Sequence, residues 1–564
     1  MPRDRVPITA AAIGGLRVAL SRFGRGTRGA RARALRTARQ RAFQDVHALV
    51  AYHDLLLFVL AHPGSRAEHA RAEAELARVA RHARAVAEHG RASERRQLRN
   101  SGIAWTEVHA DFGLATARWL VDRWPACVRL EAIEDAARSL AATLASALPP
   151  LQADIAAGGS LDADAIATTF AGTGDRLAWL VRTCDAIPAA PAVREQLFES
   201  LGVTIAVAPH ATPLSRTFTR GPAHPPCVVD ALVGSVNVAA TSARPLPRAR
   251  PPTIAARARI VDASRATLAM LARETDALAT TSPRDTAWHR LGRGVAIAMH
   301  APAAGRRGPL DAHVGFVLYR NGVPVAYGGG WPFLGGCRIG VHVFPAFRGG
   351  ESAWLFAQVL RAYRQRFGVV RFVVEPSQYG LGNREGLVSG AFWFYWRLGF
   401  RPVAPRLRAL AAAEAVKIAA QRGYRAPIDV LRRFTASDLA LDLGAGPAPP
   451  DPADLAEAAS RWLARRGRGD TARAEREALA IASRLVGRPP PTDPVEREAW
   501  RAWAPLLAQI PAIAAWPATA RAGIAAILRA KARDEFAFQR RLNGHRRLAD
   551  ALSRLARRDA AARV

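Results

Sequence analysis

The sequence predicts an α+β protein in which a mixed-sheet domain at residues 254–405 lies between two all-helical regions. Residues 43 to about 200 and 406–564 place apolar side chains at helical spacing among many Ala, Arg and Glu residues, and the first helical domain is assigned to 43–242 although the helical period is lost after residue 201. Strand patterns separated by Gly and Asn appear in 254–405. Pro and Arg accumulate at 243–253, which is the composition of a stiff linker and sets the boundary between the first helical region and the sheet domain.

Composition narrows the class of protein. The 564 residues are 50% hydrophobic and 23% charged, which is typical of globular domains and unlike disordered chains. The longest apolar run, LLLFVLA at Leu55–Ala61, is far shorter than the roughly 18 residues that span a bilayer, so no transmembrane segment is expected. The start of the chain lacks a clean signal-peptide cleavage pattern. The sequence therefore predicts a cytoplasmic protein.

Cysteine spacing argues against a metal site. The four cysteines are Cys127, Cys184, Cys227 and Cys337, and no two lie closer than 43 residues. Metal knuckles and redox motifs need two cysteines a few residues apart. We expect buried, reduced thiols and no bound metal.

The positive charge is concentrated in segments. The chain holds 80 Lys and Arg against 47 Asp and Glu, a net +33, and only two of the basic residues are lysines. Basic and acidic residues number 11 and 1 in residues 1–42, 19 and 8 in 254–405, and 29 and 17 in 406–564, whereas 43–253 is neutral. This pattern indicates a polyanionic partner, namely nucleic acid, an anionic membrane or a phosphorylated cofactor, although a solvated surface is the simpler alternative.

Residues 1–42 are interpreted as a basic N-terminal arm. The arm either lies as a helix on nucleic acid or a membrane, or is a frayed and solvated terminus. Its arginines beyond the first few residues are Arg17, Arg22, Arg25, Arg28, Arg31, Arg33, Arg36, Arg39 and Arg41.

The region 43–242 is predicted to be a helical domain. Apolar residues recur at helical spacing from Phe43 to Leu60 and stop at His62-Pro63, where proline ends a helix. A second helix with a charged outer face is predicted at Arg66–His89. Further helices are predicted near 112–124, 131–148, 176–186 and 192–201. In 406–564, Pro-rich breaks at 447–452 and 489–494 divide the helices.

Strands and helices alternate within 254–405. The pair Asn321-Gly322 stands between two apolar runs and predicts a tight hairpin, because both residues accept positive φ. A helix is predicted at Glu351–Phe367 and another at Val388–Leu398. The apolar face of the first comprises Phe356, Leu360, Tyr363 and Phe367. The predicted strands are Val295–Met299, His313–Tyr319, Val323–Tyr327, Arg338–Phe344 and Val369–Glu375.

Chemistry is indicated where the strand at 338–344 enters a glycine turn and then a helix. Free backbone N–H groups at such a turn, together with the helix dipole, form an anion site. Gly349 and Gly350 allow close approach of the main chain, and Arg348 adds a positive fork. A plain structural turn is the alternative. The second notable segment, AFWFYWRLGF at 391–400, is an aromatic helix whose rings are best explained as core, and the Gly-rich loop 377–385 precedes it.

Together the two segments resemble the GNAT N-acetyltransferase superfamily. The sequence reads VFPAFRGGESA at 343–353, similar to the family's loop that holds the pyrophosphate of acetyl-coenzyme A, and FYWRLGF at 394–400, similar to the family's later F-Y-x-x-x-G-F helix. The resemblance covers 254–405, about a quarter of the chain, and leaves the flanking helical regions unrecognised. It implies an acyl-coenzyme A co-substrate, acetyl-CoA or another acyl-CoA, and an amine acceptor.

The resemblance also implies roles for individual residues. The pyrophosphate loop would comprise Arg348, Gly349, Gly350, Ser352 and Ala353, and the strand at 339–344, including Val341 and Val343, would pair with the pantetheine arm. Tyr395 matches the tyrosine that protonates the departing thiolate in many members. A thiolate of pKa about 8.5 needs only a modest acid.

One departure and one open assignment remain. Glu351 stands where the family has its middle glycine, and a carboxylate beside a pyrophosphate is repulsive by about 4 kcal/mol at 4 Å and an effective dielectric of 20. Either Glu351 points away from the loop or donor binding is lost. The general base is His342 or Glu375, each of which is equally well explained as an ordinary strand residue.

Two functions follow. The first is an acyl-CoA-dependent N-acyltransferase acting on an unidentified amine. The alternative is a non-catalytic scaffold of the same fold that binds a polyanion through the basic arm and the last helix. The arginines assigned to that helix are Arg540, Arg541, Arg546, Arg547, Arg554, Arg557 and Arg558.

Overall fold

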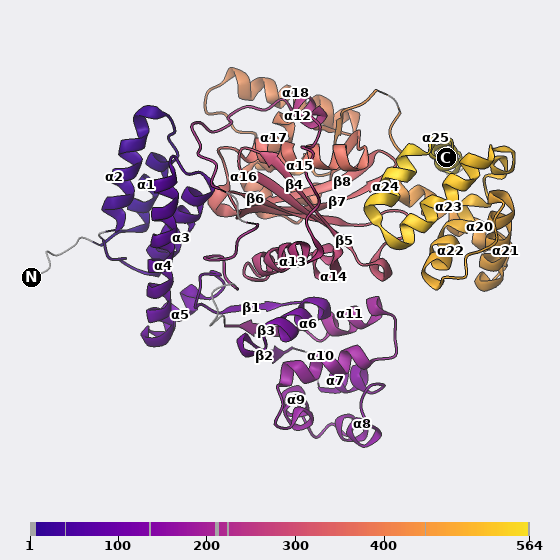
Figure 1. Ribbon diagram of the computed structural model, residues 1–564, viewed down its shortest axis with the longest axis horizontal. Coiled ribbons are helices and arrows are strands. Elements are labelled where there is room, and N and C mark those ends of the chain that lie inside the picture. Colours follow the sequence, from indigo (N-terminus) through magenta and orange to yellow (C-terminus); the bar gives the residue numbers. More distant parts are fainter. Residues whose placement is uncertain are drawn as a thin grey trace, which may run out of the picture.

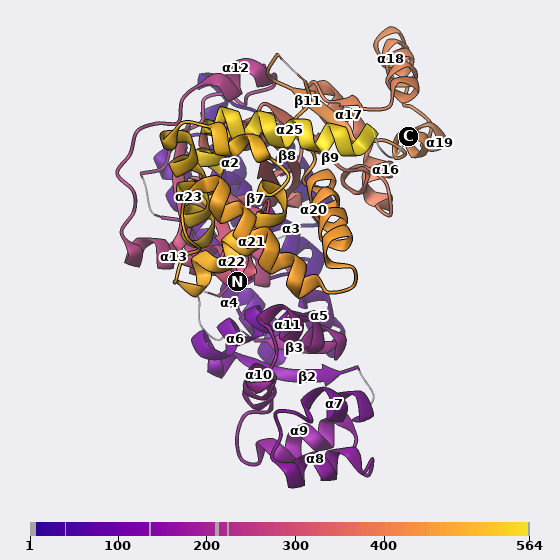
Figure 2. The same ribbon diagram turned by 90° about the vertical axis from the view of Figure 1, so that its right-hand side faces the viewer.

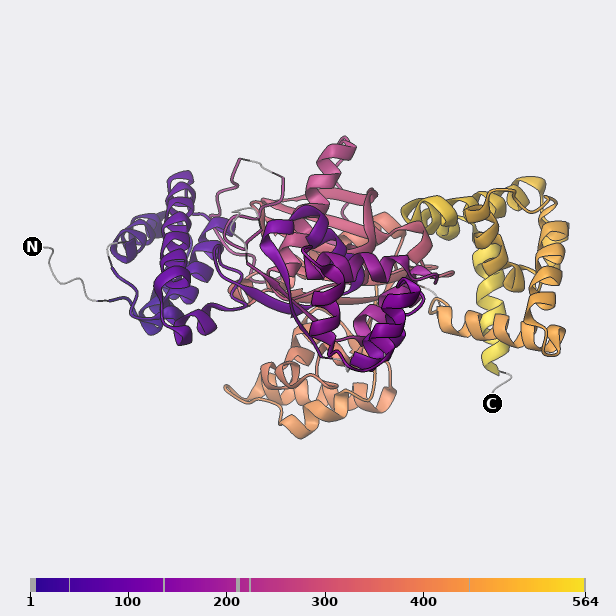
Figure 3. The ribbon, with the colours of Figure 1, turned by 90° about the horizontal axis from the view of Figure 1, so that it is seen from below.

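The computed structural model describes residues 7–39, 41–134, 137–208, 214–222, 225–445 and 447–561. Figure 1 shows a central sheet with a group of helices at each end and a small α/β unit below it. The N-terminal and C-terminal helices lie at opposite ends of the molecule, as Figure 3 also shows from below. Among the described residues, no helix is both long and apolar enough to cross a membrane.

The N-terminal helices pack around α3, which is apolar on nearly every face. Asp45 caps α3 by accepting a hydrogen bond from the Ala48 amide, and the helix ends at His62, before Pro63. The sequence predicted both α3 and α4. The helices are α1 (Ala10–Leu20), α2 (Arg28–Arg39), α3 (Val46–Ala61), α4 (Arg66–His89) and α5 (Ala92–Leu98), with a short 3-10 turn at Arg25–Thr27.

Residues 7–39 of the predicted basic arm are not a frayed terminus, because they form α1 and α2 and pack against α3 and α4. Ile13, Leu20 and Leu35 are buried because they recur on one face of each helix, and this face joins the central core. Arg31 is 1% exposed, pairs with Glu68, and donates to the backbone carbonyls of Leu20 and His62. Residues 1–6 lie outside the described part of the chain.

The small α/β unit corrects the prediction that the first region is all-helical. It holds an antiparallel sheet in the order β1-β3-β2. The predicted helix at 131–148 is wrong at its start, because Val128 and Leu130 point inward while Arg129 and Glu131 point outward, the period of a strand. Its elements are β1 (Val108–Asp111), α6 (Leu114–Arg123), β2 (Val128–Ile133), α7 (Ala137–Leu144), α8 (Pro150–Ala157), α9 (Ala163–Ala171), α10 (Arg176–Ala186), α11 (Pro191–Ser200) and β3 (Val203–Val207).

The central sheet has eight strands in the order β10-β11-β9-β8-β7-β6-β5-β4. Every neighbouring pair is antiparallel except β8 and β9, which are parallel and joined through helix α15. The strands are β4 (Thr281–Gly292), β5 (Val295–Pro302), β6 (Val314–Arg320), β7 (Val323–Phe333), β8 (Gly336–Val343), β9 (Arg371–Val374), β10 (Arg401–Pro402) and β11 (Leu439–Asp442).

Helices cover both faces of this sheet (Figure 1). Helix α15 lies on one face, and α13 and α14 lie on the other, where α13 also packs against the core of the small α/β unit through Ala266, Ala269 and Met270. The helices are α12 (Val238–Ala243), α13 (Ile254–Ala269), α14 (Asp276–Thr280), α15 (Ser352–Phe367), α16 (Arg384–Ser389), α17 (Ala391–Arg397), α18 (Pro405–Ala420) and α19 (Ile428–Phe434).

The five predicted strands and the helix α15 are present, and the Asn321-Gly322 turn has positive φ at both residues (48° and 77°). Three features differ. Strand β4 was not predicted, β11 extends the sheet past residue 405, and the helix predicted at Val388–Leu398 is broken at Gly390, where φ is 65°. Residues 244–253, within the predicted linker, form neither helix nor strand.

The C-terminal helices form a separate core around Trp503. In Figure 2 these helices face the viewer. Helices α20 and α22 begin at Pro452 and Pro494, where the sequence predicted breaks. The helices are α20 (Pro452–Gly467), α21 (Thr471–Val486), α22 (Pro494–Leu507), α23 (Ala518–Arg533), α24 (Glu535–Gly544) and α25 (Arg546–Ala561).

Candidate active site

A cavity opens where the two parallel strands separate. Strand β8 pairs with β9 only through Gly336, Cys337 and Arg338. Beyond Arg338, β8 continues to Val343 with β7 on one side and no described strand on the other. The cavity between β8, the glycine turn and helices α15–α17 has a volume of about 790 Å³.

Nine of the ten predicted site residues line this one cavity. The tenth, Glu375, lies elsewhere. Eight of the nine lie between residues 341 and 353, on β8, the glycine turn and the start of α15, and the fold brings Tyr395 of α17 to them. They are Val341, His342, Val343, Arg348, Gly349, Gly350, Ser352, Ala353 and Tyr395.

The glycine turn has a backbone that only glycine adopts easily. Gly349 and Gly350 have φ of 80° and 50°, in the left-handed region. The Ser352 hydroxyl donates to the Gly349 carbonyl at 2.8 Å, which fixes the turn at the start of α15. The positive end of the α15 dipole therefore faces the cavity through Ser352 and Ala353.

Glu351 points away from the cavity. Its side chain is 1% exposed and forms a buried ion pair with Arg320 of β6. It also accepts a hydrogen bond from the Val233 amide at 2.9 Å and lies 3.3 Å from His62 Nε2. Burial acts to raise the pKa of Glu351, but the contacts with His62, Arg320 and Val233 outweigh it and lower that pKa below its usual value. The sequence left open whether Glu351 points away from the loop, and in the structure it does.

Arg348 is held at the mouth of the cavity. Its guanidinium forms an ion pair with Glu385, and its Nε donates to the Val343 carbonyl at 3.2 Å. Both side chains are more than half exposed. Glu385 lies at the start of α16, where the sequence left open whether it faces the acceptor or only turns the chain, and its place opposite Arg348 was not predicted.

Tyr395 lies on α17 with its ring enclosed. It meets Phe356 and Phe400 edge to face, with ring centroids 5.9 and 5.7 Å apart. Burial raises the pKa of the phenol above its usual value. The hydroxyl forms no hydrogen bond with any residue that the structure describes, and the residue lines the cavity.

His342 lies between two cavities. It stacks on Tyr327 with centroids 5.1 Å apart and also lines a smaller cavity of about 240 Å³. Burial, with the charges of Arg273 and Arg348, lowers the pKa of His342. The imidazole is therefore neutral at pH 7, with an unprotonated ring nitrogen.

Glu375 is separated from the main cavity. It forms an ion pair with Arg338 at 2.9 Å, and Arg338 also contacts Asp451 at 2.7 Å. It lines the smaller cavity together with Glu274, His313, Trp331 and His342. Glu274 and Trp331 belong to segments in which the sequence showed no motif, so they were missed.

The described residues contain no group of three His, Cys, Asp or Glu side chains placed to hold a metal. Comparison of the chain with protein-family models, curated proteins and solved structures finds no match in any of the three.

Proposed function

We propose that the protein is an acyl-coenzyme A-dependent N-acyltransferase. The observation that carries the proposal is the convergence of a separated parallel strand pair, a two-glycine turn at a helix start and a buried tyrosine on one 790 Å³ cavity. The order of these elements agrees with the resemblance to the GNAT superfamily seen in the sequence. That Glu351 is turned away removes the main objection to donor binding.

The residues of the cavity fit a long anionic thioester. Backbone N–H groups of the turn and of the first turn of α15 suit a pyrophosphate, and Arg348 adds a charge-assisted contact. The β8 edge at Val341 and Val343, which faces no described strand, offers backbone groups to an amide-containing arm. We propose acetyl-CoA or another acyl-CoA as the donor.

The chain supplies a base and a hydrogen-bond donor. A bound acyl-CoA supplies the acyl group and a sulfur leaving group. The amine nitrogen forms the new C–N bond as the C–S bond breaks, and its proton passes to His342 directly or through water. Tyr395 donates a hydrogen bond to the sulfur. Because its pKa is raised above that of a thiol, about 8.5, it stabilises the thiolate mainly as a donor and not by complete proton transfer.

The acceptor is proposed to enter through the smaller cavity. His342 and Gln378 line both cavities, so β8 separates the donor side from the acceptor side. Trp331 is 40% exposed there, and Glu274 and Glu375 add carboxylates. This lining favours an amine attached to an apolar or aromatic group. A cytoplasmic location belongs to the same proposal and is supported by four cysteines that are all free.

Calorimetric titration tests the donor site. Coenzyme A is titrated at about 150 mM salt, with ATP beside it to measure unspecific polyphosphate binding. We expect saturable binding of coenzyme A well above that of ATP, and weaker binding by Arg348→Gln. Equal binding of the two, or none, would contradict the proposal.

A second candidate function rests on a basic surface at the C-terminus. Two of the seven arginines predicted for the last helix, Arg540 and Arg541, lie on α24 instead, and the other five lie on α25. All seven are exposed, and none forms an ion pair with a described residue. On the neighbouring helices, by contrast, Arg501, Arg529 and Arg533 are paired with glutamates.

The five arginines on α25 lie on one side of the helix. They span about a third of its circumference, opposite Leu548, Leu552 and Leu555. Unpaired charge on one face favours nucleic acid.

Salt dependence tests this surface. Each phosphate contact lowers the slope of log K against log salt by about 0.9 for duplex DNA, so five contacts give a slope of about −4.5. Replacing Arg547, Arg554 and Arg558 by Gln is expected to flatten that slope by about 3, whereas Arg501→Gln with Arg533→Gln leaves it unchanged. The nucleic-acid proposal would be contradicted if the protein bound only to anionic vesicles. It would also be contradicted if the triple variant left the salt slope unchanged.

A further inference from the structure

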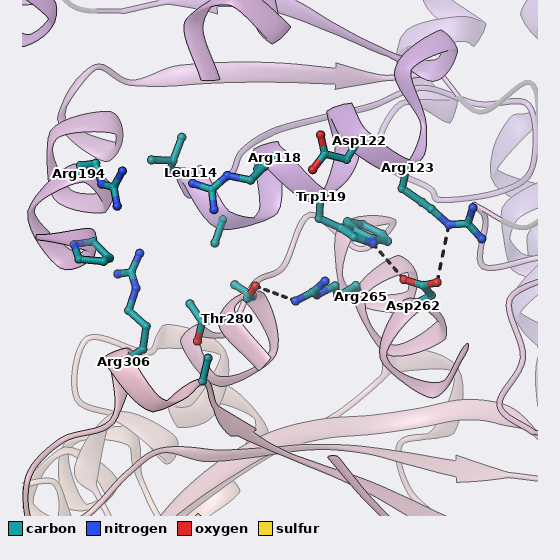
Figure 4. Close-up of a pocket in the computed structure, with 14 residues that line it drawn as sticks. Leu114, Arg118, Trp119, Asp122, Arg123, Arg194, Asp262, Arg265, Thr280 and Arg306 are labelled. Atoms are coloured by element: carbon teal, nitrogen blue, oxygen red, sulfur yellow. Dashed lines mark hydrogen bonds and ion pairs between the residues drawn. The ribbon is translucent and has the colours of Figure 1, made fainter. Parts of the chain in front are cut away.

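A third cavity, lined by several arginines, lies away from the proposed active site. It has a volume of about 500 Å³ and lies between the small α/β unit and the central domain, with walls from α6, α11, α13, α14 and the 3-10 turn at Ala304–Arg306. Five arginines line it, and Figure 4 shows three of them, Arg118, Arg194 and Arg306, directed toward the same end.

Asp185 and Glu195 hold these three guanidiniums from outside the cavity, two of them through carboxylates and the third through a backbone carbonyl. Asp185 binds Arg118 through Nε and Nη2, and its backbone carbonyl accepts from Arg194 Nη1. Glu195 accepts from Arg306 Nη2 at 2.9 Å. Neither Asp185 nor Glu195 lines the cavity. The contacts therefore orient the arginines and leave their other nitrogens available.

Five guanidinium nitrogens remain without a hydrogen bond to any described residue. They are Arg118 Nη1, Arg194 Nε and Nη2, and Arg306 Nε and Nη1. Arg194 has no carboxylate partner among the described residues, and the same is true of Arg265, which donates to the carbonyls of Leu278, Ala279 and Thr281. Burial lowers the pKa of Arg265, which indicates that its charge is poorly compensated.

The other end of the cavity is different. Asp122 and Asp262 lie there, and Asp262 pairs with Arg123 and accepts from the Trp119 indole N–H at 3.1 Å. Figure 4 shows this group apart from the three converging arginines. Leu114, Trp119 and Pro191 give the wall apolar surface between the two ends.

We propose that this cavity binds a small molecule that carries a phosphate group on an apolar or aromatic body. Three guanidiniums that approach from different elements suit a tetrahedral anion, whereas a planar carboxylate is satisfied by one arginine fork. Pro191 is the first residue of α11, so the positive end of that helix dipole adds to the field. A volume of 500 Å³ is sufficient for a ligand of this kind.

Calorimetry with phenyl phosphate tests the proposal on the full chain. We expect saturable binding that Arg194→Gln and Arg306→Gln each weaken about tenfold, the loss of one charge-assisted contact. Two controls are expected to bind like wild type: Arg123→Gln, at the other end of this cavity, and Arg348→Gln, at the glycine turn. Arg306→Lys keeps the charge beside Glu195 but loses the fork, so it is expected to bind several-fold more weakly while its thermal midpoint is unchanged.

Three results would overturn the proposal. The first is the absence of phenyl phosphate binding. The second is loss of binding in Arg348→Gln but not in Arg194→Gln, which would place the anion at the glycine turn. The third is binding of benzoate with the same affinity as phenyl phosphate, which would show that the cavity accepts any anion and does not select a phosphate group. The proposal does not depend on acyl-CoA chemistry, so these results test it independently of the proposed function.

Discussion

At the residue scale, Glu351 forms a buried ion pair and does not line the 790 Å³ cavity. Removing it leaves Arg320 buried and unpaired, because that guanidinium is 0% exposed in its side chain. Breaking a buried pair from one side costs about 3–5 kcal/mol. We therefore expect Glu351→Ala to lower the free energy of unfolding by this amount in urea titrations. A loss below 1 kcal/mol would show that the pair is not formed as described.

Glu385 competes with any anion for Arg348. Its carboxylate forms an ion pair with Arg348 at the glycine turn. Replacing it by Gln removes the competing charge, so we expect Glu385→Gln to tighten coenzyme A binding several-fold and Arg348→Gln to weaken it about tenfold. Calorimetric dissociation constants check both changes. In the double variant Glu385→Gln with Arg348→Gln, coenzyme A should bind no more tightly than to Arg348→Gln alone, because Glu385 acts on binding through Arg348.

Tyr395 provides a test of the chemical step. Its hydroxyl has no partner among the described residues, so Tyr395→Phe is expected to leave the free energy of unfolding within about 0.5 kcal/mol of wild type. A hydrogen bond to a charged sulfur is worth about 1.5–3 kcal/mol, so turnover should fall about 10- to 100-fold. Release of free thiol from acyl-CoA measures it. Equal turnover of the two proteins would remove Tyr395 from the mechanism.

At the scale of elements, the glycine turn can be tested with a matched control. Gly349 has φ of 80°, and an added Cβ would meet nothing within 4 Å, so the cost of Gly349→Ala is conformational, about 1–2 kcal/mol. Gly382 has φ of 64° and the same open space but does not line the cavity. We expect Gly349→Ala and Gly382→Ala to lower stability alike in urea titrations, and only Gly349→Ala to weaken coenzyme A binding. Equal affinity in both variants would exclude the turn from the donor site.

Local patterns explain which elements could be predicted. Strands β5 and β6 are continuous apolar runs, and Asn321-Gly322 fixes the following hairpin. Strand β4 carries Pro283, Arg284 and Asp285 and has no clear period, so only its pairing with β5 makes it a strand. Strand β11 has four residues and is specified by β9 and β10 on either side.

The site could be predicted in part for a related reason. The residues on β8, the glycine turn and α17 occur in two contiguous motifs, and the structure places them on one cavity. The direction of Glu351 depends on Arg320 and His62, which are 31 and 289 positions away in the sequence. Glu375 likewise forms its ion pair with Arg338, which lies on the neighbouring strand β8, parallel to β9. No local pattern encodes such contacts.

At the scale of the whole molecule, part of the positive charge is used to join its parts. Arg31 ties α2 to α4, and Arg320 ties the sheet to α15. Arg216 connects α3 to the segment 214–222 by a hydrogen bond to Asp54 at 2.7 Å, and it also donates to the Ser101 carbonyl. These contacts link the N-terminal helices, the small α/β unit and the sheet, so a single carboxylate at such a joint affects the stability of the assembly.

Asp54 at this joint makes stability depend on pH. Burial acts to raise its pKa, but Arg216 and His53 lower that pKa from its ordinary 3.8 to about 2. A carboxyl with a lowered folded-state pKa stabilises the fold fully above its unfolded-state pKa, and loses that contribution as the pH falls toward 2. The shift corresponds to about 2 kcal/mol. We expect Asp54→Asn to lower the free energy of unfolding by about this amount at pH 7.

The same variant should approach wild-type stability as the pH falls from 4 toward 2, because the wild-type carboxylate is then protonated. Denaturant titrations across this range measure the difference. Asp230→Asn is the matched control, since Asp230 pairs with Arg28 at the surface and is 74% exposed, and such a pair contributes at most about 0.5–1 kcal/mol. A difference between Asp54→Asn and wild type that does not narrow with falling pH would mean that Asp54 acts through packing and not through its charge.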